Sequence, residues 1–485
     1  MIDIGTEKQF FIDDLLFDSS ENVELCMNPP AQHPEPVFTP RHEWEEQGLG
    51  LYNTVLRDEG RFRLWYAACM KLGLPSEGAI RLCYAESDDG LNWECPTIGR
   101  IPFRGSKDNN IVAPPEERQS QQGAAVYRDD RAPAEERYKL WTKFRPTDDQ
   151  VEAGWQPGLY AMHSSDGIDW RLYPEQPNPP AKCDTQNVFF WDDRIDAYVG
   201  YTRDWASQAA AEAAEAGPTR YRSVARWTSP DFRNWSGGER VFEADEEDLT
   251  IPVPGPRTDG SPVIDFYTNC VTRAHGASNV YFMFPAAFYH WGEEKLPATF
   301  DVQLLTSRDG ITWRRAGGRR PFLRKGLDAT PSGGMIVANP TLIDVGNETW
   351  LYYTGTGRRH VSGDPDAPPP STGLFRATMR RDGIMSADAG WQGGEFTTPP
   401  LRHGGRRLKL NFDGSAGGWL QVELQSADGE TLPGHARQDC DPVYGNDLAR
   451  TVTWGGSPGL PANGALRLRV FMRDMKLYTF RYSRH

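Results

Sequence analysis

A seven-residue turn motif, Ser-x-Asp-Gly-x-x-Trp, recurs along this 485-residue chain and restricts its fold more than any other feature. It is complete at 87–93, 164–170 and 307–313, lacks its glycine at 229–235, and survives at 380–384 only as an Asp-Gly turn. Successive copies start roughly 65 to 78 residues apart, which fits one supersecondary unit per copy. We therefore expect five similar units, each built from strands, because the motif follows short apolar segments.

Two strand patterns precede the motif in most units. An aromatic segment, such as 62–66, lies directly before the turn, and a segment that ends in a polar turn, such as 54–58, lies before that. With the strand after the turn, each unit is a four-stranded meander, the blade of a β-propeller. The sequence predicts an all-β protein with a five-bladed β-propeller over residues 35–403, in which only 206–216 has the composition of a helix.

The blade motif stops after about residue 404. Beyond it, short segments alternate apolar and polar residues: 408–412, 419–424, 466–471 and 478–482. This pattern predicts a small antiparallel β-sandwich over residues 404–485. Residues 1–34 contain one further apolar strand at 9–13, which either closes the propeller ring or joins the sandwich; the sequence leaves both arrangements open.

Composition excludes several classes of protein. No apolar run is long enough to span a bilayer, and the N-terminus lacks the basic flank and apolar core of a signal peptide. A net charge of −14 argues against nucleic-acid binding. The seven cysteines are scattered and unpaired in sequence, which indicates reduced thiols, so we expect a cytoplasmic protein with no membrane partner. The nine histidines are isolated and no nucleotide-binding motif occurs, so we expect no cofactor and no metal site.

Taken together, the blades and the C-terminal sandwich resemble the five-bladed β-propeller glycosidases, the group that includes glycoside hydrolase families 43 and 32. The resemblance covers the propeller, and the appended sandwich is similar to that of family 32. It implies a carbohydrate substrate and a pair of catalytic carboxyl groups. The Asn-Asp-Pro opening of family 32 is not found and no Glu-Cys acid motif is unambiguous, so no catalytic residue is carried over from it. The repeated turn also resembles the Asp box of sialidases, which has one more residue between Asp and Gly.

Glycoside hydrolysis needs one carboxyl group as acid and another as base or nucleophile. Aspartates that repeat in every blade are turn formers, so the candidates are those that break the repeat. Asp184 and Asp265 stand at the start of the innermost strands of blades three and four, among side chains rich in hydrogen-bonding groups. Glu46, in the acidic segment before the first blade, is the third candidate, because its longer side chain suits an acid that reaches the glycosidic oxygen.

Seven further residues are predicted to bind the substrate. They stand near the starts of first or third strands, or after second strands, which should face the same mouth: Asp301, Gln186, Tyr267, Arg203, His290, Arg358 and Tyr52. Tyrosines can stack on a sugar face, and arginines can bind an anionic substituent. The proline-rich segment 359–372 is expected to form a rim over the mouth.

The leading hypothesis is a glycoside hydrolase that cleaves a terminal sugar from an oligosaccharide or glycoside. Two alternatives stay open. One is a carbohydrate-binding propeller that has no catalytic activity, and the other is a sialidase-like or glycosyl-transferring enzyme. The sequence indicates neither the sugar nor the oligomeric state.

Overall fold

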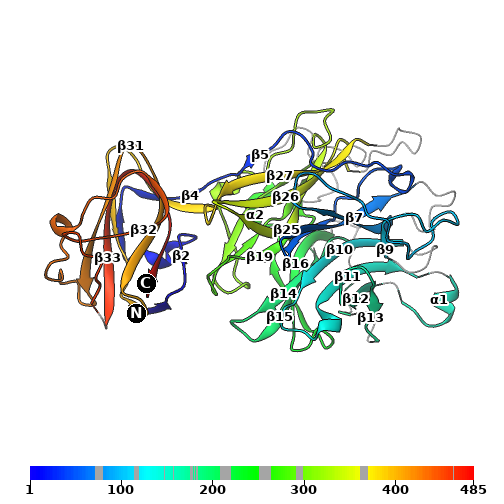
Figure 1. Ribbon diagram of the computed structural model, residues 1–485, viewed down its shortest axis with the longest axis horizontal. Coiled ribbons are helices and arrows are strands. Elements are labelled where there is room, and N and C mark those ends of the chain that lie inside the picture. The colour runs from blue at the N-terminus through cyan, green and yellow to red at the C-terminus, as the bar shows by residue number, and fades with distance from the viewer. Residues whose placement is uncertain are drawn as a thin grey trace, which may run out of the picture.

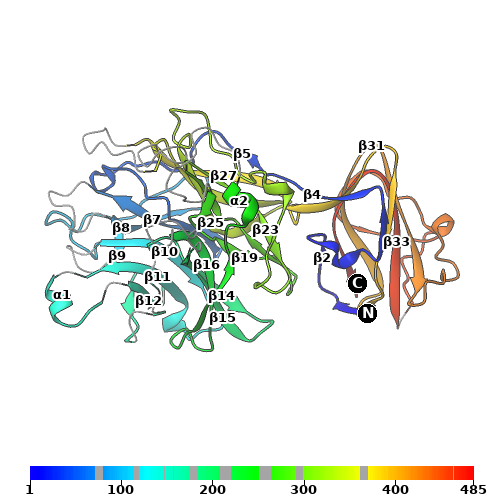
Figure 2. The same ribbon diagram turned by 180° about the vertical axis from the view of Figure 1, so that it is seen from behind.

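A computed structural model describes residues 1–70, 80–113, 120–146, 148–156, 158–174, 178–179, 181, 184–207, 220–250, 264–290, 299–360, 370–461 and 464–484. The molecule has two parts, a propeller and a sandwich, and both chain termini lie on the sandwich (Figure 1). Seen from behind, the same two parts are joined by a narrow connection that contains β4 (Val23–Met27), which pairs with β28 (Met385–Ala389) (Figure 2).

The described residues form five sheets of the predicted blade type, so the predicted all-β propeller is confirmed. Blade 1 contains β6 (Thr54–Asp58), β7 (Arg61–Cys69), β8 (Ile80–Ser87) and β9 (Ile111–Ala113). Blade 2 contains β10 (Ser120–Arg128), β11 (Tyr138–Arg145), β12 (Gly158–Ser164) and β13 (Arg171–Leu172). Blade 3 contains β14 (Val188–Asp192), β15 (Ala197–Ser207), β16 (Arg220–Ser229) and β17 (Ser236–Phe242).

Blade 4 is split into an upper and a lower sheet. The upper one contains β18 (Ile264–Phe266), β21 (Ala286–Tyr289) and β22 (Thr299–Val302). The lower one contains β19 (Val271–Arg273), β20 (Tyr281–Met283), β23 (Leu305–Ser307) and β24 (Arg314–Arg315). Blade 5 contains β25 (Met335–Val345), β26 (Glu348–Thr356), β27 (Thr372–Arg380) and, as its outer strand, β5 (Ala31–Gln32). The ring is therefore closed by a strand from the N-terminal segment, which pairs with β27.

The repeated turn forms as its sequence requires. In its first copy the Asp89 carboxylate accepts hydrogen bonds from the backbone N–H groups of Leu91 and Asn92, and Ser87 Oγ accepts one from Gly90. Gly90 has φ +73°, a conformation that glycine adopts without strain. In the copy that lost its glycine, Phe232 takes this conformation instead, with φ +66°. The repeated aspartates are turn formers, as predicted.

A second repeated device joins neighbouring blades. An aspartate at the end of one innermost strand accepts a hydrogen bond from the tyrosine that begins the second strand of the next blade. These pairs are Tyr138 to Asp58, Tyr198 to Asp129 and Tyr281 to Asp192. All three carboxylates are buried, so each pair is a buried hydrogen bond between two neighbouring blades, which we call an inter-blade clamp. The aspartates predicted to sit at hairpin turns thus also hold the ring together.

The sandwich is one connected set of strands. Its long strands are β31 (Arg407–Ser426) and β33 (Ala465–Ser483), to which β32 (Asn446–Thr451) is added at the edge. Besides β2 (Gln9–Phe10), β4 and β28, four short strands from before residue 404 join this sheet: β1 (Ile2–Gly5), β3 (Ser19–Glu21), β29 (Gly394–Thr397) and β30 (Leu401–His403). The predicted strand at 9–13 appears as β2 (Gln9–Phe10), which pairs with β33. After the propeller blades, the first strand of this sheet along the chain is β28, which starts before residue 404.

Helices are short in the described part of the chain: α1 (Asp148–Glu152) and α2 (Glu246–Thr250). No helix there is long and apolar enough to cross a membrane. The helix predicted at 206–216 falls almost entirely outside the described residues.

Candidate functional site

The candidate site lies at one end of the propeller ring, where innermost strands begin, second strands end and third strands begin. Asp184 precedes β14 of blade 3, and Asp265 lies in β18 of blade 4, so both carboxylates belong to adjacent blades at this end. We call this end the mouth. The described part of it is a cluster of ion pairs and aromatic rings between blades 3 and 4.

Asp184 is held by one arginine. Arg203, from β15, donates through Nη1 to Asp184 Oδ1 and through Nη2 to the backbone carbonyl of Tyr267 at 2.8 Å. The arginine side chain is almost fully buried, whereas that of Asp184 is 49% exposed. Asp184 Oδ2 accepts no hydrogen bond from the described residues. One oxygen is therefore fixed in position by Arg203, and no described residue donates to the other.

Asp265 is buried and more fully bound. Its Oδ2 accepts hydrogen bonds from the backbone N–H and Nη1 of Arg222, at 3.1 and 3.0 Å, and His290 Nε2 lies 3.4 Å from Oδ1. Burial alone would raise the pKa of Asp265, but His290 and Arg222 outweigh it and hold the pKa below its usual value. The lowered pKa favours the ionised carboxylate, which suits an electrostatic role.

The ring of Tyr267 connects the two halves of the cluster. The guanidinium groups of Arg203 and Arg222 lie 4.3 and 4.7 Å from its centroid, within the range of cation–π attraction. Its hydroxyl lies 3.2 Å from His360 Nε2. Burial, followed by the charges of Arg222, His290 and Arg203, lowers the pKa of His360 to about 4, so this imidazole is neutral near pH 7. Trp205, which is partly exposed, lies beside both arginines.

Two predicted binding residues form the floor below this cluster. Gln186 is fully buried, and its Nε2 donates to the carbonyls of Asn53 in blade 1 and Ala124 in blade 2, so no amide N–H is left for a substrate. Tyr52 is also buried, against Tyr267, and burial raises its pKa. These residues link blades across the channel and do not stack on a sugar.

Glu46 is not joined to this cluster by any contact that the structure gives. It ends a single 3-10 turn at Glu43–Glu45, and its carboxylate lies 3.7 Å from Arg104, with both side chains partly exposed. The neighbouring Glu45 is the buried acid of this segment. It caps the turn by accepting from the backbone N–H of His42 and from the Tyr66 hydroxyl, which makes its role structural.

Asp301 lies on the other face of blade 4. It pairs with Ala287, whereas Asp265 pairs with Phe288 in the adjacent register position, so the Asp301 and Asp265 side chains point to opposite faces of the sheet. Burial raises the pKa of Asp301 to about 7, and its Oδ1 is buried without a partner among the described residues. It is the one predicted site residue with a raised carboxyl pKa, but it does not face the Asp265 side of the mouth.

The remaining predicted residue, Arg358, stands two residues after the end of β26, and its backbone N–H donates to Thr356 Oγ1 at 3.2 Å. Most of the expected rim at 359–372 lies outside the described residues. Two functional candidates were not predicted, Arg222 and His360. Arg222 is the third residue of the third strand of blade 3, and Asp301 is the third residue of the third strand of blade 4. This equivalence between blades is the sequence signal that could have identified Arg222.

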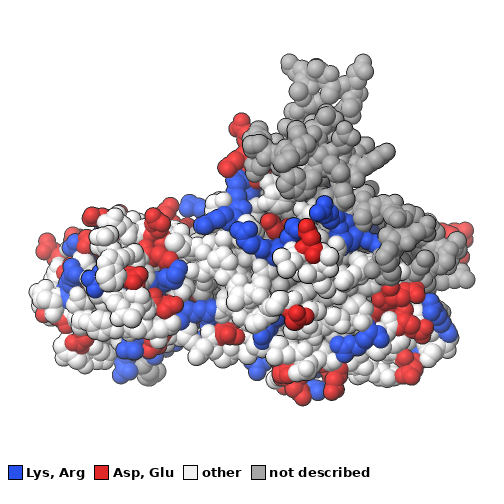
Figure 3. Space-filling model, turned by 90° about the horizontal axis from the view of Figure 1, so that it is seen from above, with Lys and Arg blue, Asp and Glu red and all other residues white. Residues whose placement is uncertain are grey.

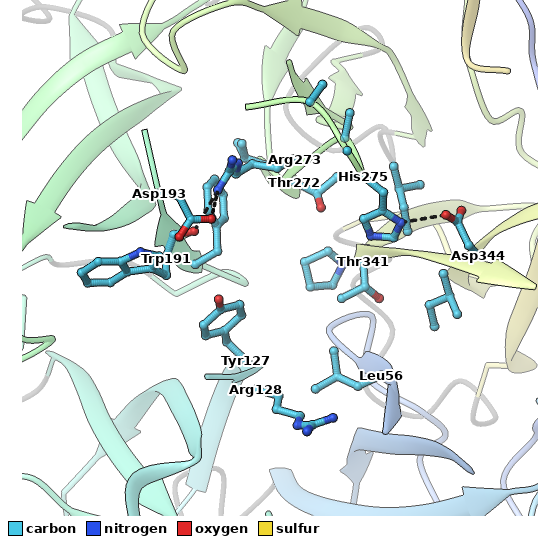
Figure 4. Close-up of a pocket in the computed structure, with 18 of the residues that line it drawn as sticks. Leu56, Tyr127, Arg128, Trp191, Asp193, Thr272, Arg273, His275, Thr341 and Asp344 are labelled. Atoms are coloured by element: carbon cyan, nitrogen blue, oxygen red, sulfur yellow. Dashed lines mark hydrogen bonds and ion pairs between the residues drawn. The ribbon is translucent and has the colours of Figure 1, made fainter. Parts of the chain in front are cut away.

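A larger hollow lies at the opposite end of the channel, which faces the sandwich. Its volume is about 1200 Å³, and all five innermost strands contribute to it. Figure 4 shows Tyr127, Thr272 and Thr341 around the opening and two ion pairs at its edge. These are His275 with Asp344, at 3.0 Å, and Arg273 with Asp193, at 3.4 Å. None of the ten predicted site residues lines it.

We favour the mouth over this hollow as the reactive end. The carboxylates that line the hollow are engaged: Asp344 by His275 and Thr349, Asp193 by Arg273 and Arg131. The mouth instead offers a half-exposed carboxylate oxygen next to cations and aromatic rings. Lys and Arg side chains also gather on the propeller half in the view of Figure 3, although the whole chain has a net charge of −14.

In the described part of the chain, no group of three or more His, Cys, Asp or Glu residues is placed to hold a metal ion.

No family model and no curated protein matches the chain. The solved structures that it resembles include one described as a glycoside hydrolase, at 15% identity over 74% of this chain and 94% of the other, with a TM-score of 0.46. A family 43 arabinoxylan arabinofuranohydrolase from Bacillus subtilis is 13% identical over 94% and 99%, with a TM-score of 0.40. A fructofuranosidase from Schwanniomyces occidentalis is 10% identical over 94% and 97%, with a TM-score of 0.43. The resemblance predicted from the blades is thus found among solved structures, but at these values it says nothing about residues or substrate.

Proposed function

We propose that the chain is a glycoside hydrolase whose substrate binds in the mouth between blades 3 and 4. The observation that supports this most is the network Asp184–Arg203–Tyr267–Arg222–Asp265, which brings two carboxylates from adjacent innermost strands into one cluster. Paired carboxyl groups are the requirement of this chemistry. Cations next to them favour a sugar that carries an anionic substituent, such as a uronic acid.

Within this proposal the two aspartates differ in role. Asp184 acts as base or nucleophile, because its Oδ2 is open while Oδ1 is fixed by Arg203. Asp265 stays ionised and stabilises the positive charge that develops on the sugar ring in the transition state. Trp205, which is partly exposed, supplies an aromatic ring that can stack on a sugar.

A second candidate function is carbohydrate binding without turnover. It is favoured by one specific observation: each carboxylate of the network is ion-paired with an arginine, so a guanidinium group already occupies one oxygen of each. A hydrolase needs a protonated carboxyl group at the leaving oxygen. A binding protein does not.

Sugar release from a panel of furanosides, pyranosides, uronides and sialosides separates these functions. Wild type is compared with Asp184→Asn and with the control Asp196→Asn, whose 85% exposed side chain stands in the hairpin between β14 and β15, at the end of these strands away from the mouth. Release by wild type and the control, and none by Asp184→Asn, is the expected result. Binding of a sugar without any release would favour the second candidate, and neither binding nor release would contradict both.

A further inference from the structure

A small hollow lies where the sandwich meets the propeller. Its volume is about 240 Å³, and it is lined by residues of the N-terminal segment, blade 5, the link after β27, and the strands β31 and β33. It adjoins the larger hollow at the sandwich end of the channel, because Lys8, Asp344 and Arg481 line both. It shares no residue with the mouth, and the inference below does not depend on the proposed function.

Two cations face each other across the sandwich wall of this hollow. Lys409 of β31 and Arg481 of β33 are directly opposite partners in the antiparallel ladder. Residues opposite one another in such a pair project to the same side, and like charges there are destabilising. Both side chains are half-buried, and no described carboxylate lies within ion-pair distance of either. The described residues therefore provide no carboxylate partner that would offset the repulsion between Lys409 and Arg481.

Two more cations complete the lining, and the acids nearby are already engaged. Arg381 projects from the link after β27, and no described carboxylate lies within ion-pair distance of it. Lys8 binds Asp382 at 2.7 Å, and Asp344 is held by His275 and Thr349. Four cations thus surround one hollow that contains two acids, in a chain whose overall charge is strongly negative.

We infer that this hollow binds a small phosphate-type dianion, either inorganic phosphate or the phosphate group of a small ester. A planar guanidinium fork binds such oxygens with paired hydrogen bonds, and an ammonium group adds a point charge. The volume is below the ~300 Å³ at which drug-sized pockets begin, so the ligand is small. A bound dianion would convert the repulsion between Lys409 and Arg481 into attraction to a shared partner.

The ligand would also connect the two parts of the molecule. Lys409 and Arg481 belong to the sandwich, and Arg381 directly follows β27 of blade 5. A ligand that binds only the folded arrangement raises the apparent stability by mass action, and the thermal midpoint rises with its concentration.

The test is isothermal titration and thermal unfolding of the full chain, with inorganic phosphate and with glucose 6-phosphate, against sodium chloride of the same ionic strength. The variants are Lys409→Gln and Arg481→Gln. The control is Arg171→Gln, which removes the same charge from an exposed position of β13. We expect saturable binding by wild type and by the control, weakened about tenfold or more in both hollow variants.

A second readout separates a binding site from a structural one. Without phosphate, both hollow variants should be at least as stable as wild type, because each removes half of a repulsive pair. Their thermal midpoints should then no longer rise with phosphate. Saturation by glucose 6-phosphate alone would assign the site to phosphate esters, and saturation by both to the phosphate group itself. No saturable response to either anion in wild type, or an equal loss in Arg171→Gln, would overturn the inference.

Discussion

Removing one hydroxyl from an inter-blade clamp should destabilise the propeller by a predictable amount. Tyr198 of blade 3 donates to Asp129 Oδ2 of blade 2, and the other carboxylate oxygen accepts from the backbone N–H of Arg131 at 3.0 Å. Tyr198→Phe leaves a buried carboxylate oxygen without its donor. Its ring contacts, with Trp191 at 4.9 Å and Phe232 at 5.3 Å, remain in place, so the change removes a hydrogen bond and creates almost no cavity.

A hydrogen bond to a charged group contributes about 1.5–3 kcal/mol. With a urea m value of about 3 kcal/mol/M, the unfolding midpoint of the propeller should fall by roughly 0.5–1 M. Tryptophan fluorescence during urea unfolding measures this shift. The matched control is Tyr444→Phe, whose ring is 59% exposed on the sandwich, and its midpoint should not move. Equal midpoints for Tyr198→Phe and wild type would refute the clamp as a source of stability.

Two further variants test the mouth. Asp301→Asn should stabilise the protein at pH 8 but not at pH 4. The pKa of Asp301 is about 7 in the folded state and lower in the unfolded state, so wild type loses stability as the pH rises from the unfolded to the folded value. At ~1.4 kcal/mol per pKa unit, this loss is on the order of 4 kcal/mol. Urea midpoints at the two pH values measure this, and an equal gain at both would contradict it. Gly123→Ala should destabilise the protein more than Gly346→Ala. Both glycines have a positive φ, but only at Gly123 would the added Cβ lie 2.0 Å from a backbone oxygen, the carbonyl of Thr185. Equal losses of unfolding free energy would show that this close approach is unimportant.

The fold was predictable because its signal repeats. The Asp-Gly turn needs its own residues and nothing distant, so Asp89 and Gly90 could be interpreted from sequence alone. The clamps could not, since they depend on which tyrosine of the next blade reaches a given aspartate. The ring closure was likewise hidden: β5 has two residues, too few for a periodic pattern, and its partner β27 lies more than 300 residues later.

The positions of the candidate residues could be predicted better than their contacts. The count from each hairpin turn placed Asp184 and Asp265 on adjacent blades at one end of the ring, and the structure has them there, because blade geometry repeats. The count could not show that the Gln186 amide donates to two backbone carbonyls, or that the Asp301 side chain points to the other face of its sheet. Those facts depend on side-chain direction and on contacts between blades, which strand position alone does not determine.

The most direct test of the central claim compares the two ends of the channel. The rate of sugar release, as kcat/KM on whichever glycoside the panel identifies, is measured for Asp184→Asn at the mouth and for Thr272→Val in the opposite hollow. We predict a loss of about 10²–10⁴-fold for Asp184→Asn, the range typical of a lost acid–base group, and a value close to wild type for Thr272→Val. Full activity of Asp184→Asn together with a large loss in Thr272→Val would contradict the account and place the reaction at the end that faces the sandwich.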